Sequence, residues 1–380
     1  MKLTADWLAA PAVQRVLGVL TAAGHQAYVV GGCVRNTLMG LPVTDIDIAT
    51  DARPEQVIAL TEGAGLRAVP TGIAHGTVTV VAEGEGFEVT TFRADVETDG
   101  RYATVAFSDD LETDAARRDF TMNALYAGAD GTVIDPMGGL PDLTARRVRF
   151  VGDPRARIAE DYLRILRFFR FHAQYGDPAQ GLEAEALAAC AAGASGLARL
   201  SAERITAELR KLLAAPDPAP SVAAMAQSGV LARVLPGADP RALPVLVHLE
   251  AGLPPHALRR LLVLGGETAH LRLTRVEARD LARARDALGD MRGAAELGYR
   301  LGAELATDVI LARAALFEAP LPPDWQSDVA RGAGAVFPVR ARDLPDLSGP
   351  ELGARLKALE SRWVASGFAL DREALLKTPG

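Results

Sequence analysis

The sequence changes its hydrophobic period near residue 150, and this change constrains the fold more than any other feature. From about residue 26 to 150, short apolar runs bounded by glycine alternate with short helical patterns, which is typical of an α/β domain. After about residue 155 the strand pattern nearly vanishes, and apolar residues recur at helical spacing, as over 157–175 and 201–215. Because 380 residues are also too many for one compact core, we expect an α/β head followed by an all-α region.

The beginning of the head has a clear order of elements. The run AYVVGG, residues 27–32, predicts a buried strand that ends at a glycine pair. Residues 33–40 then fit a short helix that ends at Gly40. Residues 44–50, TDIDIAT, fit a strand whose alternate side chains point to opposite faces. The segment therefore predicts a strand, a glycine turn, a helix and a second strand.

Two later segments of the head predict a hairpin and a loop. Residues 76–82 and 87–94 are apolar runs that flank a short turn between Glu83 and Gly86, so we expect a β-hairpin there. The segment from Asp95 to Asp110 is polar and irregular, which makes it a candidate mobile loop.

Asp45 and Asp47 are the first candidates for chemistry. Residues i and i+2 of a strand point to the same face, so Asp45-Ile46-Asp47 would hold two carboxylates close together. A like-charged pair is costly unless a cation joins it, and carboxylate oxygens suit Mg²⁺. Taken alone, the pattern is more often a solvent-facing strand end. With the residues that precede it, the pair predicts a catalytic magnesium site, because two-metal nucleotidyl transfer needs this arrangement.

The residues before this pair are suited to a triphosphate. Gly31 and Gly32 end a strand and open a helix, so free backbone N–H groups can meet phosphate oxygens without obstruction by side chains. Arg35, in the first turn of that helix, can add a charge-assisted hydrogen bond. A glycine pair, an arginine and a carboxylate pair about a dozen residues later together predict nucleotide binding.

A family resemblance follows from these residues. The run VVGGCVRNTLMGLPVTDIDIAT resembles the N-terminal signature of the class II CCA-adding enzymes and bacterial poly(A) polymerases, within the DNA polymerase β superfamily. Four further segments follow in that family's order, at residues 71–80, 87–101, 116–126 and 159–171. The resemblance covers roughly residues 25–215. It implies a polymerase β-like nucleotidyltransferase head with a mixed sheet, and Mg²⁺-dependent nucleotidyl transfer.

Position 36 departs from the family's pattern. The chain has Asn36 where the family generally has aspartate. An amide can still form hydrogen bonds but cannot neutralise Arg35, so we expect altered orientation or phosphate affinity more readily than loss of function.

The segment RRDF implies further nucleotide contacts. In the family it contributes to nucleotide binding near the ribose and phosphates, which implicates Arg117, Arg118 and Asp119. A third carboxylate beside the metals is either Glu88, on the strand after the hairpin, or Asp119.

The segment EDYLR resembles the motif with which the family selects cytosine or adenine. It places Asp161 and Arg164 at i and i+3, so we expect both on one face of a helix, where they can pair with the edge of a base. Arg167 and Arg170 are further nucleotide-binding candidates. Because steps of three drift around a helix, these two cannot share the face of Asp161, and we expect them to touch phosphate, RNA or a neighbouring helix.

The resemblance implies a division of labour along the chain. Residues 1–150 would form the nucleotidyltransferase head, 151–215 a helical neck for base recognition, and 216–380 a helical body and tail for tRNA. The implied reaction adds CMP and AMP from CTP and ATP to the 3′ end of tRNA without a template. Poly(A) polymerase, CC-only and A-only addition stay open, and so does an RNA-binding homologue without catalysis. The absence of a His-Asp doublet argues against an added phosphohydrolase domain.

Two segments are predicted to shape or stabilise the structure around the site. Residues 135–139, DPMGG, resemble the family's hinge between head and helices, although a simple turn is equally consistent. Ser201, Glu203 and Arg204 resemble a helix-stabilising motif, with Ser201 as the N-cap and Arg204, Glu208 and Lys211 available for structural pairs.

Charge and cysteine content limit the surroundings. The net charge of −7 argues against indiscriminate coating of nucleic acid, but residues 146–170 hold eight arginines against three acids, which predicts a local RNA and triphosphate groove. The only cysteines, Cys33 and Cys190, lie far apart, and no run of about 20 apolar residues exists. We therefore predict a cytoplasmic protein without membrane attachment.

Overall fold

The computed structural model describes residues 1–95 and 105–377, which fall into two compact units. The first unit comprises residues 1–212 and 220–234, and the second comprises 213–219 and the chain from 235 onward. The change of sequence pattern near 150 therefore lies inside the first unit, whereas the boundary predicted near 215 lies close to the edge of that unit at residue 212. None of the described helices is both long and apolar enough to span a membrane.

The head of the first unit is built on a seven-stranded mixed sheet. Its strands lie in the order β3-β4-β5-β2-β1-β8-β9, and the β2–β5 pair is parallel while the other pairs are antiparallel. The strands are β1 (Ala27–Val30), β2 (Asp47–Thr50), β3 (Arg67–Gly72), β4 (Thr77–Ala82), β5 (Glu85–Thr91), β8 (Tyr126–Ala127) and β9 (Val133–Ile134). The helices of the head are α1 (Asp6–Ala9), α2 (Pro11–Ala22), α3 (Gly32–Leu38), α4 (Pro54–Gly63), α5 (Leu111–Ala116) and α6 (Gly139–Thr144), with the 3₁₀ turns η1 (Ile73–His75) and η2 (Thr121–Asn123). The predicted α/β head with a mixed sheet is confirmed.

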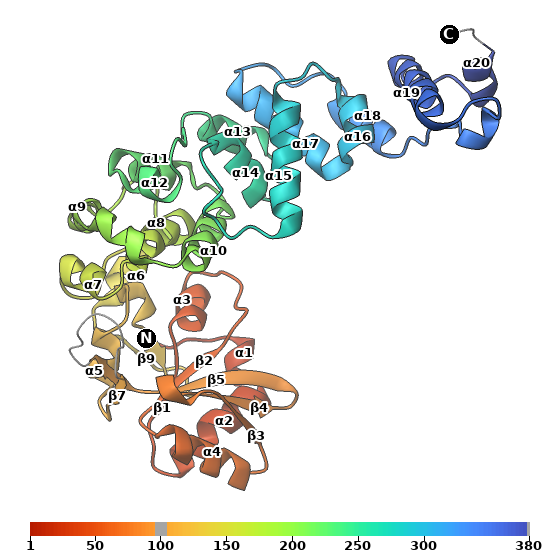
Figure 1. Ribbon diagram of the computed structural model, residues 1–380. Helices are drawn as coiled ribbons and strands as arrows, with labels where there is room; N and C mark the ends of the chain where they lie inside the picture. Colours follow the sequence, from red (N-terminus) through yellow and green to blue (C-terminus); the bar gives the residue numbers. More distant parts are fainter. Residues whose placement is uncertain (96–104, 378–380) are drawn as a thin grey trace. The chain divides into compact units, whose positions relative to one another are not determined.

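Helices α2 and α4 cover the sheet, as Figure 1 shows. Val13, Val16 and Leu17 of α2 and Val57 of α4 are buried. Apolar residues that recur at helical spacing lie on one face of a helix, and this face packs on the sheet. Each helix begins with a proline, whose fixed φ suits the first helical position. The N–H that proline lacks is not missed there, because an N–H at this position has no acceptor within the helix.

The predicted β-hairpin is confirmed as β4 and β5. Glu83 and Gly84 form its two-residue turn with φ values of 51° and 87°, and the flanking residues Ala82 and Glu85 are paired. Positive φ at both turn positions matches the right-handed twist of the strands. The ends of the predicted loop 95–110 pair as β6 (Arg93–Asp95) and β7 (Val105–Phe107), and its middle, 96–104, lies outside the described residues.

The rest of the first unit is helical. It contains α7 (Pro154–Glu160), α8 (Leu163–Tyr175), α9 (Ala184–Gly193), η3 (Ala194–Arg199), α10 (Ala202–Leu213), α11 (Ala219–Gln227) and α12 (Val230–Val234). Phe120 of the head packs on Phe171 of α8, with ring centroids 4.7 Å apart, and on Phe150 at 4.9 Å. Buried Ser221 of α11 contacts the His172 ring at 2.8 Å. Aromatic packing therefore joins α8 to the head, and α11 returns to pack beside α8.

The second unit is also helical. Its elements are α13 (Leu243–Leu249), α14 (Ala257–Leu264), α15 (Arg275–Leu288), α16 (Ala294–Leu301), α17 (Ala303–Leu316), α18 (Trp325–Ala333), η4 (Ala341–Asp343), α19 (Gly349–Ala365) and α20 (Arg372–Leu376). A buried ionic cluster lies among them, in which the Glu250 carboxylate forms ion pairs with Arg259 at 2.9 Å and with Arg260 at 2.8 Å. Arg259 also pairs with buried Asp308 at 2.6 Å. Apart from isolated bridges, the described chain beyond β9 is helical, which confirms the predicted all-α region.

Helices α16 and α18 pack closely at two glycines, Gly298 and Gly332. A methyl group added to Gly332 would lie 1.8 Å from the Ala295 carbonyl oxygen, so Gly332→Ala forces the helices apart. We expect it to lower the free energy of unfolding by about 2–4 kcal/mol, measured by urea denaturation. Gly353 of α19 has nothing within 4 Å of its added methyl group and is the control. Gly353→Ala should raise stability by about 0.5–1 kcal/mol, and equal effects of the two changes would contradict the close crossing.

Candidate nucleotide-binding site

A polar cavity of about 480 Å³ lies within the first unit. Seven arginines and three aspartates are among its lining residues, so its walls carry an excess of positive charge that suits a triphosphate. The lining residues are Gly31, Gly32, Arg35, Asp47, Arg93, Arg117, Arg118, Asp119, Asn123, Asp161, Leu163, Arg164, Arg167, Phe171 and Arg204. The structure thus brings nearly all of the sequence-predicted residues to one cavity. Of those predicted residues, Asp45 and Arg170 are not among the described lining residues.

Gly31 makes the turn between β1 and α3. Its φ of 73° and ψ of −117° are strained for a residue with a side chain, and a methyl group there would lie 3.5 Å from the Arg118 guanidinium. The expectation of a free N–H at this position is wrong, because the Gly31 N–H donates to the Leu125 carbonyl at 3.0 Å. Gly31 therefore contributes close backbone approach to the cavity.

The two predicted catalytic carboxylates lie at the start of β2. Asp47 is the first residue of the strand, and Asp45 lies in the irregular segment just before it, so the predicted start at residue 44 is wrong. Both residues are exposed. Parallel pairing places Glu88 of β5 in register with Asp47. Although its side chain is exposed at the surface, the pKa of Asp47 is raised, because the surrounding protein atoms reduce its solvation and the Glu88 and Asp45 carboxylates repel its charge; Arg118 acts in the opposite direction.

These carboxylates fit a divalent cation by their chemistry. Hard oxygen ligands on neighbouring chain segments repel one another, and a cation relieves that repulsion. Within residues 1–95 and 105–377, no group of three or more His, Cys, Asp or Glu side chains is placed to hold a metal. Mg²⁺ typically binds one or two carboxylates and completes its shell with water and substrate phosphates, so a pair of carboxylates fits it by its chemistry.

Asp119 is paired with other residues that line the cavity. Its carboxylate accepts hydrogen bonds from Arg167 Nε at 2.7 Å and from Asn123 Nδ2 at 2.9 Å. Burial would raise the pKa of Asp119, but Arg167 and the hydrogen bonds from Asn123 and the Phe120 N–H lower it. Of the two alternatives for a third carboxylate, Glu88 is the one that stands beside Asp47.

Arg117 and Arg118 are held by one buried acid. Asp114 accepts from Arg117 Nε at 2.9 Å and from Arg118 Nη2 at 3.0 Å. The Tyr126 hydroxyl donates to Asp114 at 2.7 Å and accepts from Arg118 Nε at 2.9 Å. This network fixes both guanidinium groups where they line the cavity, so a ligand meets charges that are already oriented.

The predicted helical spacing of Asp161 and Arg164 is wrong. Helix α7 ends at Glu160 and α8 begins at Leu163, and Asp161 between them has extended backbone, with φ −153° and ψ 106°. Arg164 Nη1 donates to the Arg157 carbonyl at 2.6 Å and pairs with Glu160. Both Asp161 and Arg164 nevertheless line the cavity, Asp161 from the break itself and Arg164 from the first turn of α8.

Arg167 and Arg170 have different surroundings. Arg167 lines the cavity and pairs with Asp119, as described above. Arg170 is only 7% exposed and pairs with Glu208 of α10 at 2.5 Å and with Gln174 at 3.0 Å. The structure therefore places Arg170 in the packing between α8 and α10, which is the neighbouring-helix alternative for this residue.

Arg204 is the main functional candidate that sequence reasoning gave only a structural role. Its Nη2 donates to Asp161 Oδ2 at 2.6 Å, and both residues line the cavity. The pair spans 43 positions, so no local pattern could connect the two residues. Arg93, Asn123 and Phe171 were also missed. Of these, Arg93 follows a strand in the FRAD segment and offered the clearest signal.

The predicted basic groove over 146–170 is largely compensated within the protein. Arg147 and Arg149 both pair with buried Asp142, and Arg157 pairs with Glu160. Of the arginines in this segment, Arg164 and Arg167 line the cavity.

The two predicted support segments have clear contacts. Asp135 accepts from the Gly139 N–H at 2.6 Å and from the Leu140 N–H at 2.9 Å, so DPMGG forms a turn that caps α6. A methyl group at Gly139 would lie 2.2 Å from the Thr121 carbonyl oxygen, which fixes this turn against η2. In the other segment, Ser201 Oγ accepts from the Arg204 N–H at 3.4 Å at the start of α10.

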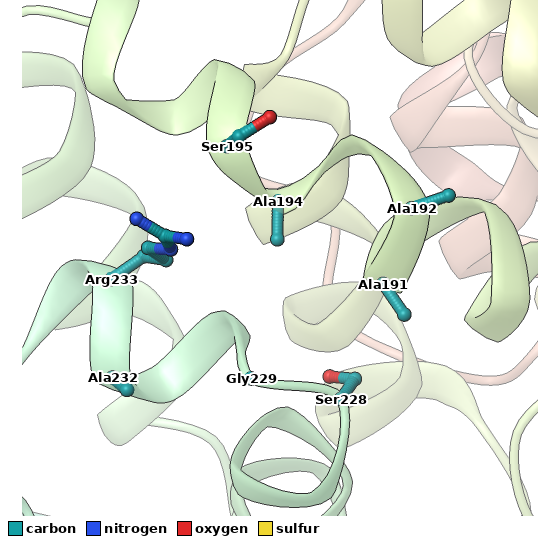
Figure 2. A pocket seen from close by; sticks show the side chains of 8 residues that line it. All are labelled: Ala191, Ala192, Ala194, Ser195, Ser228, Gly229, Ala232 and Arg233. Atoms are coloured by element: carbon teal, nitrogen blue, oxygen red, sulfur yellow. The ribbon is translucent and has the colours of Figure 1, made fainter.

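A second cavity, which no motif predicted, lies elsewhere in the first unit and is shown in Figure 2. It measures about 600 Å³ and is lined by Ala191, Ala192, Ala194, Ser195, Ser228, Gly229, Ala232 and Arg233. Small side chains and one arginine give it no arrangement suited to proton transfer or metal binding.

Comparison with protein families matches two segments of the chain. Residues 27–149 match the family described as "Poly A polymerase head domain". Residues 181–241 match the family described as "Probable RNA and SrmB- binding site of polymerase A". The first match contains all the cavity residues contributed by the head.

Individual relatives extend the similarity over most of the chain. The human "CCA tRNA nucleotidyltransferase 1, mitochondrial" is 34% identical over 377 residues, which cover 93% of this chain and 86% of the relative. A "CCA-adding enzyme" of Geobacillus thermodenitrificans is 44% identical over 232 residues, 60% of this chain and 55% of that one. The crystal structure of the Bacillus stearothermophilus CCA-adding enzyme in complex with CTP aligns with a TM-score of 0.73 at 30% identity and covers 96% of this chain and 95% of the other.

Proposed function

The chain belongs to the family of CCA-adding tRNA nucleotidyltransferases, and on that premise we propose that its arginine-lined cavity binds CTP or ATP for addition of CMP and AMP to the 3′ end of tRNA. The observation that carries the proposal is the meeting of two kinds of residue in one cavity. Asp47 enters it from the sheet, and Asp161 and Arg164 enter it from the break between α7 and α8. A nucleotide bound there would have its phosphates near the carboxylates and its base near the helices.

The protein's own groups would hold the nucleotide in place. Arg117 and Arg118, oriented by Asp114, would bind phosphate oxygens by charge-assisted hydrogen bonds. Gly31 would let the phosphates approach the backbone closely. Asp161 accepts and Arg164 donates, so together they offer both kinds of partner to the edge of a base. Asp161 is held by Arg204, which would set its orientation.

We propose that Asp45 and Asp47 bind the metal ion and that this ion is Mg²⁺. When bound, Mg²⁺ lowers the pKa of the attacking 3′-hydroxyl and neutralises charge on the leaving pyrophosphate. The 3′-hydroxyl of the RNA attacks the α-phosphorus of the nucleotide, the bond to pyrophosphate breaks, and the RNA gains one nucleotide. Glu88, in register with Asp47, is the residue we assign as a third carboxylate near the site, and in this structure it does not form a three-ligand group with Asp45 and Asp47.

The remaining chain would serve the tRNA. We assign base recognition to the neck, residues 151–215, and tRNA binding to the body and tail, residues 216–380. We also propose a cytoplasmic location, because Cys33 and Cys190 are both unpaired and buried.

Poly(A) polymerase is the second candidate, because the head matches a family of that description. The experiment that separates the candidates supplies tRNA lacking its CCA end with Mg²⁺ and with CTP, ATP or both, and sequences the products. We expect CC with CTP alone and CCA with both nucleotides. Long adenosine tails would assign poly(A) polymerase, and CC without the terminal A would assign a CC-only enzyme. Extension of a tRNA that ends in CC, but not of one that lacks CCA, would assign an A-only enzyme. The absence of any extension of either tRNA would contradict the proposed function.

A further inference from the structure

The chain contains only two asparagines, and the side chains of both contact the same guanidinium group. Asn36 Oδ1 accepts from Arg35 Nη2 at 2.8 Å and from Arg35 Nε at 3.1 Å. Asn123 Oδ1 accepts from Arg35 Nη1. The Tyr175 hydroxyl accepts from Nη2 at 2.9 Å, and the Tyr175 ring centroid lies 4.0 Å from the guanidinium carbon.

All of these direct partners of Arg35 are uncharged. Arg35 is 6% exposed and lines the nucleotide cavity, so its charge sits at the cavity wall with little water around it. A carboxylate in place of either amide would form an ion pair with the guanidinium and compete with phosphate oxygens for it. Neutral acceptors satisfy the guanidinium N–H groups while its charge stays available.

Each amide also uses its other end. Asn36 Nδ2 donates to the Pro42 carbonyl at 2.8 Å, and Asn123 Nδ2 donates to Asp119 at 2.9 Å. Asp119 in turn pairs with Arg167. An aspartate at either position could accept from Arg35 but, when ionised, could not donate. The two contacts of each amide therefore require an amide.

Pro42 belongs to the segment 41–46, which joins α3 to β2 and carries Asp45. Leu41, Pro42 and Thr44 are exposed, so burial contributes little to holding this segment in place. Asn36 holds it twice, through the Pro42 contact and through a backbone hydrogen bond from the Leu41 N–H to the Asn36 carbonyl at 2.8 Å.

We propose that Asn36 and Asn123 are positioning residues that hold Arg35 between them without neutralising it, and that Asn36 also fixes the Asp45 segment to Arg35. The proposal rests on the proposed function, because it assigns the phosphates to Arg35 and the metal to Asp45. It gives the departure from aspartate at position 36 a physical role, which is to leave one more positive charge for the triphosphate.

The test separates charge from positioning with three variants. Asn36→Asp and Asn123→Asp both add a negative charge beside Arg35, so each should weaken CTP binding without divalent metal by about tenfold, measured by calorimetry in EDTA. Asn36→Leu adds no charge beside Arg35, and Asn123 and Tyr175 still hold the guanidinium group, so its metal-free binding should change less than about threefold. Its half-saturating Mg²⁺ concentration for CTP binding should rise about fivefold or more, because the Asp45 segment loses its side-chain tie to Arg35 and keeps only the backbone hydrogen bond from the Leu41 N–H.

Asn123→Asp should leave the Mg²⁺ dependence close to that of the unchanged protein, because Asn123 does not contact the Asp45 segment. Gln14→Glu is the matched control: the Gln14 amide donates to the Leu8 and Ala129 carbonyls, outside the cavity, and both measurements should stay unchanged. A thermal melt shows whether each variant is folded. If Asn36→Leu does not fold, the half-saturating Mg²⁺ concentration of Asn36→Asp replaces its measurement, because an ionised aspartate cannot donate to the Pro42 carbonyl; it should rise relative to that of Asn123→Asp, which adds the same charge.

The proposal is overturned if the aspartate variants bind metal-free CTP as tightly as the unchanged protein, or if Asn36→Leu keeps its Mg²⁺ dependence. If the unchanged protein itself neither binds CTP nor extends tRNA, the proposed function fails instead, so the two failures are distinguishable.

Discussion

Asp47→Ala is expected to lower the rates of CMP and AMP transfer by at least about a thousandfold while the protein stays folded. Asp47 is the cavity's carboxylate from the sheet, and its exposed side chain makes little contribution to packing. Without it, charge on the attacking and leaving oxygens would develop uncompensated. Asp45→Ala should have a similar effect on both nucleotides, because a metal bound through one carboxylate alone is held weakly.

The measurement is single-turnover extension of tRNA with each nucleotide at saturating Mg²⁺. Glu85→Ala is the matched control, since Glu85 is an exposed carboxylate at the start of β5 and does not line the cavity. Its rates should stay within about twofold. Rates of Asp47→Ala close to those of the control would remove the metal assignment. Glu88→Ala measures whether the carboxylate paired with Asp47 contributes as a third ligand.

Asp161→Ala and Arg164→Ala are expected to change which base is added. Both side chains line the cavity at the break between α7 and α8, and a base that loses its complementary partner no longer differs from its competitors in hydrogen bonding. We expect the preference for CTP and ATP over GTP and UTP to fall about 10- to 100-fold. Arg204→Ala should shift the preference in the same direction by a smaller factor, because Asp161 would keep its carboxylate but lose its fixed orientation.

Competition among the four nucleotides, read by sequencing the products, measures this preference. Arg155→Ala is the control: Arg155 is an exposed arginine of α7 outside the cavity. Variants of Asp161 and Arg164 that kept the original order of nucleotides would show that base selection lies elsewhere.

Local sequence patterns predicted part of the sheet side of the site. A glycine pair between strand and helix, and two carboxylates one residue apart, lie within a single continuous segment, and Gly31 and Asp47 line the cavity as that segment indicated. The hairpin was predictable for the same reason, because Glu83 and Gly84 permit the turn between two apolar runs. Patterns of this range depend on backbone geometry alone.

The helical side of the site was predictable only in part. The i and i+3 rule applies within one continuous helix, and the break at Asp161 contains neither proline nor glycine to announce it. The partners of Arg204 and Arg170 come from segments about 40 positions away, so their roles depend on how helices pack. Tertiary contacts, which no local period encodes, decided between a ligand contact and a structural ion pair.

The return of α11 and α12 to the first unit limits how evolution or engineering can recombine this protein. The chain leaves that unit after residue 212, comes back at 220 and leaves again after 234. A chimera joined at the proline-rich stretch near 216 would lose Ser221 and Met225, which are fully buried. The apolar surface that they cover around His172 would then be exposed to water. A breakpoint after Val234 would instead transfer the first unit, with the cavity that it contains, as one piece.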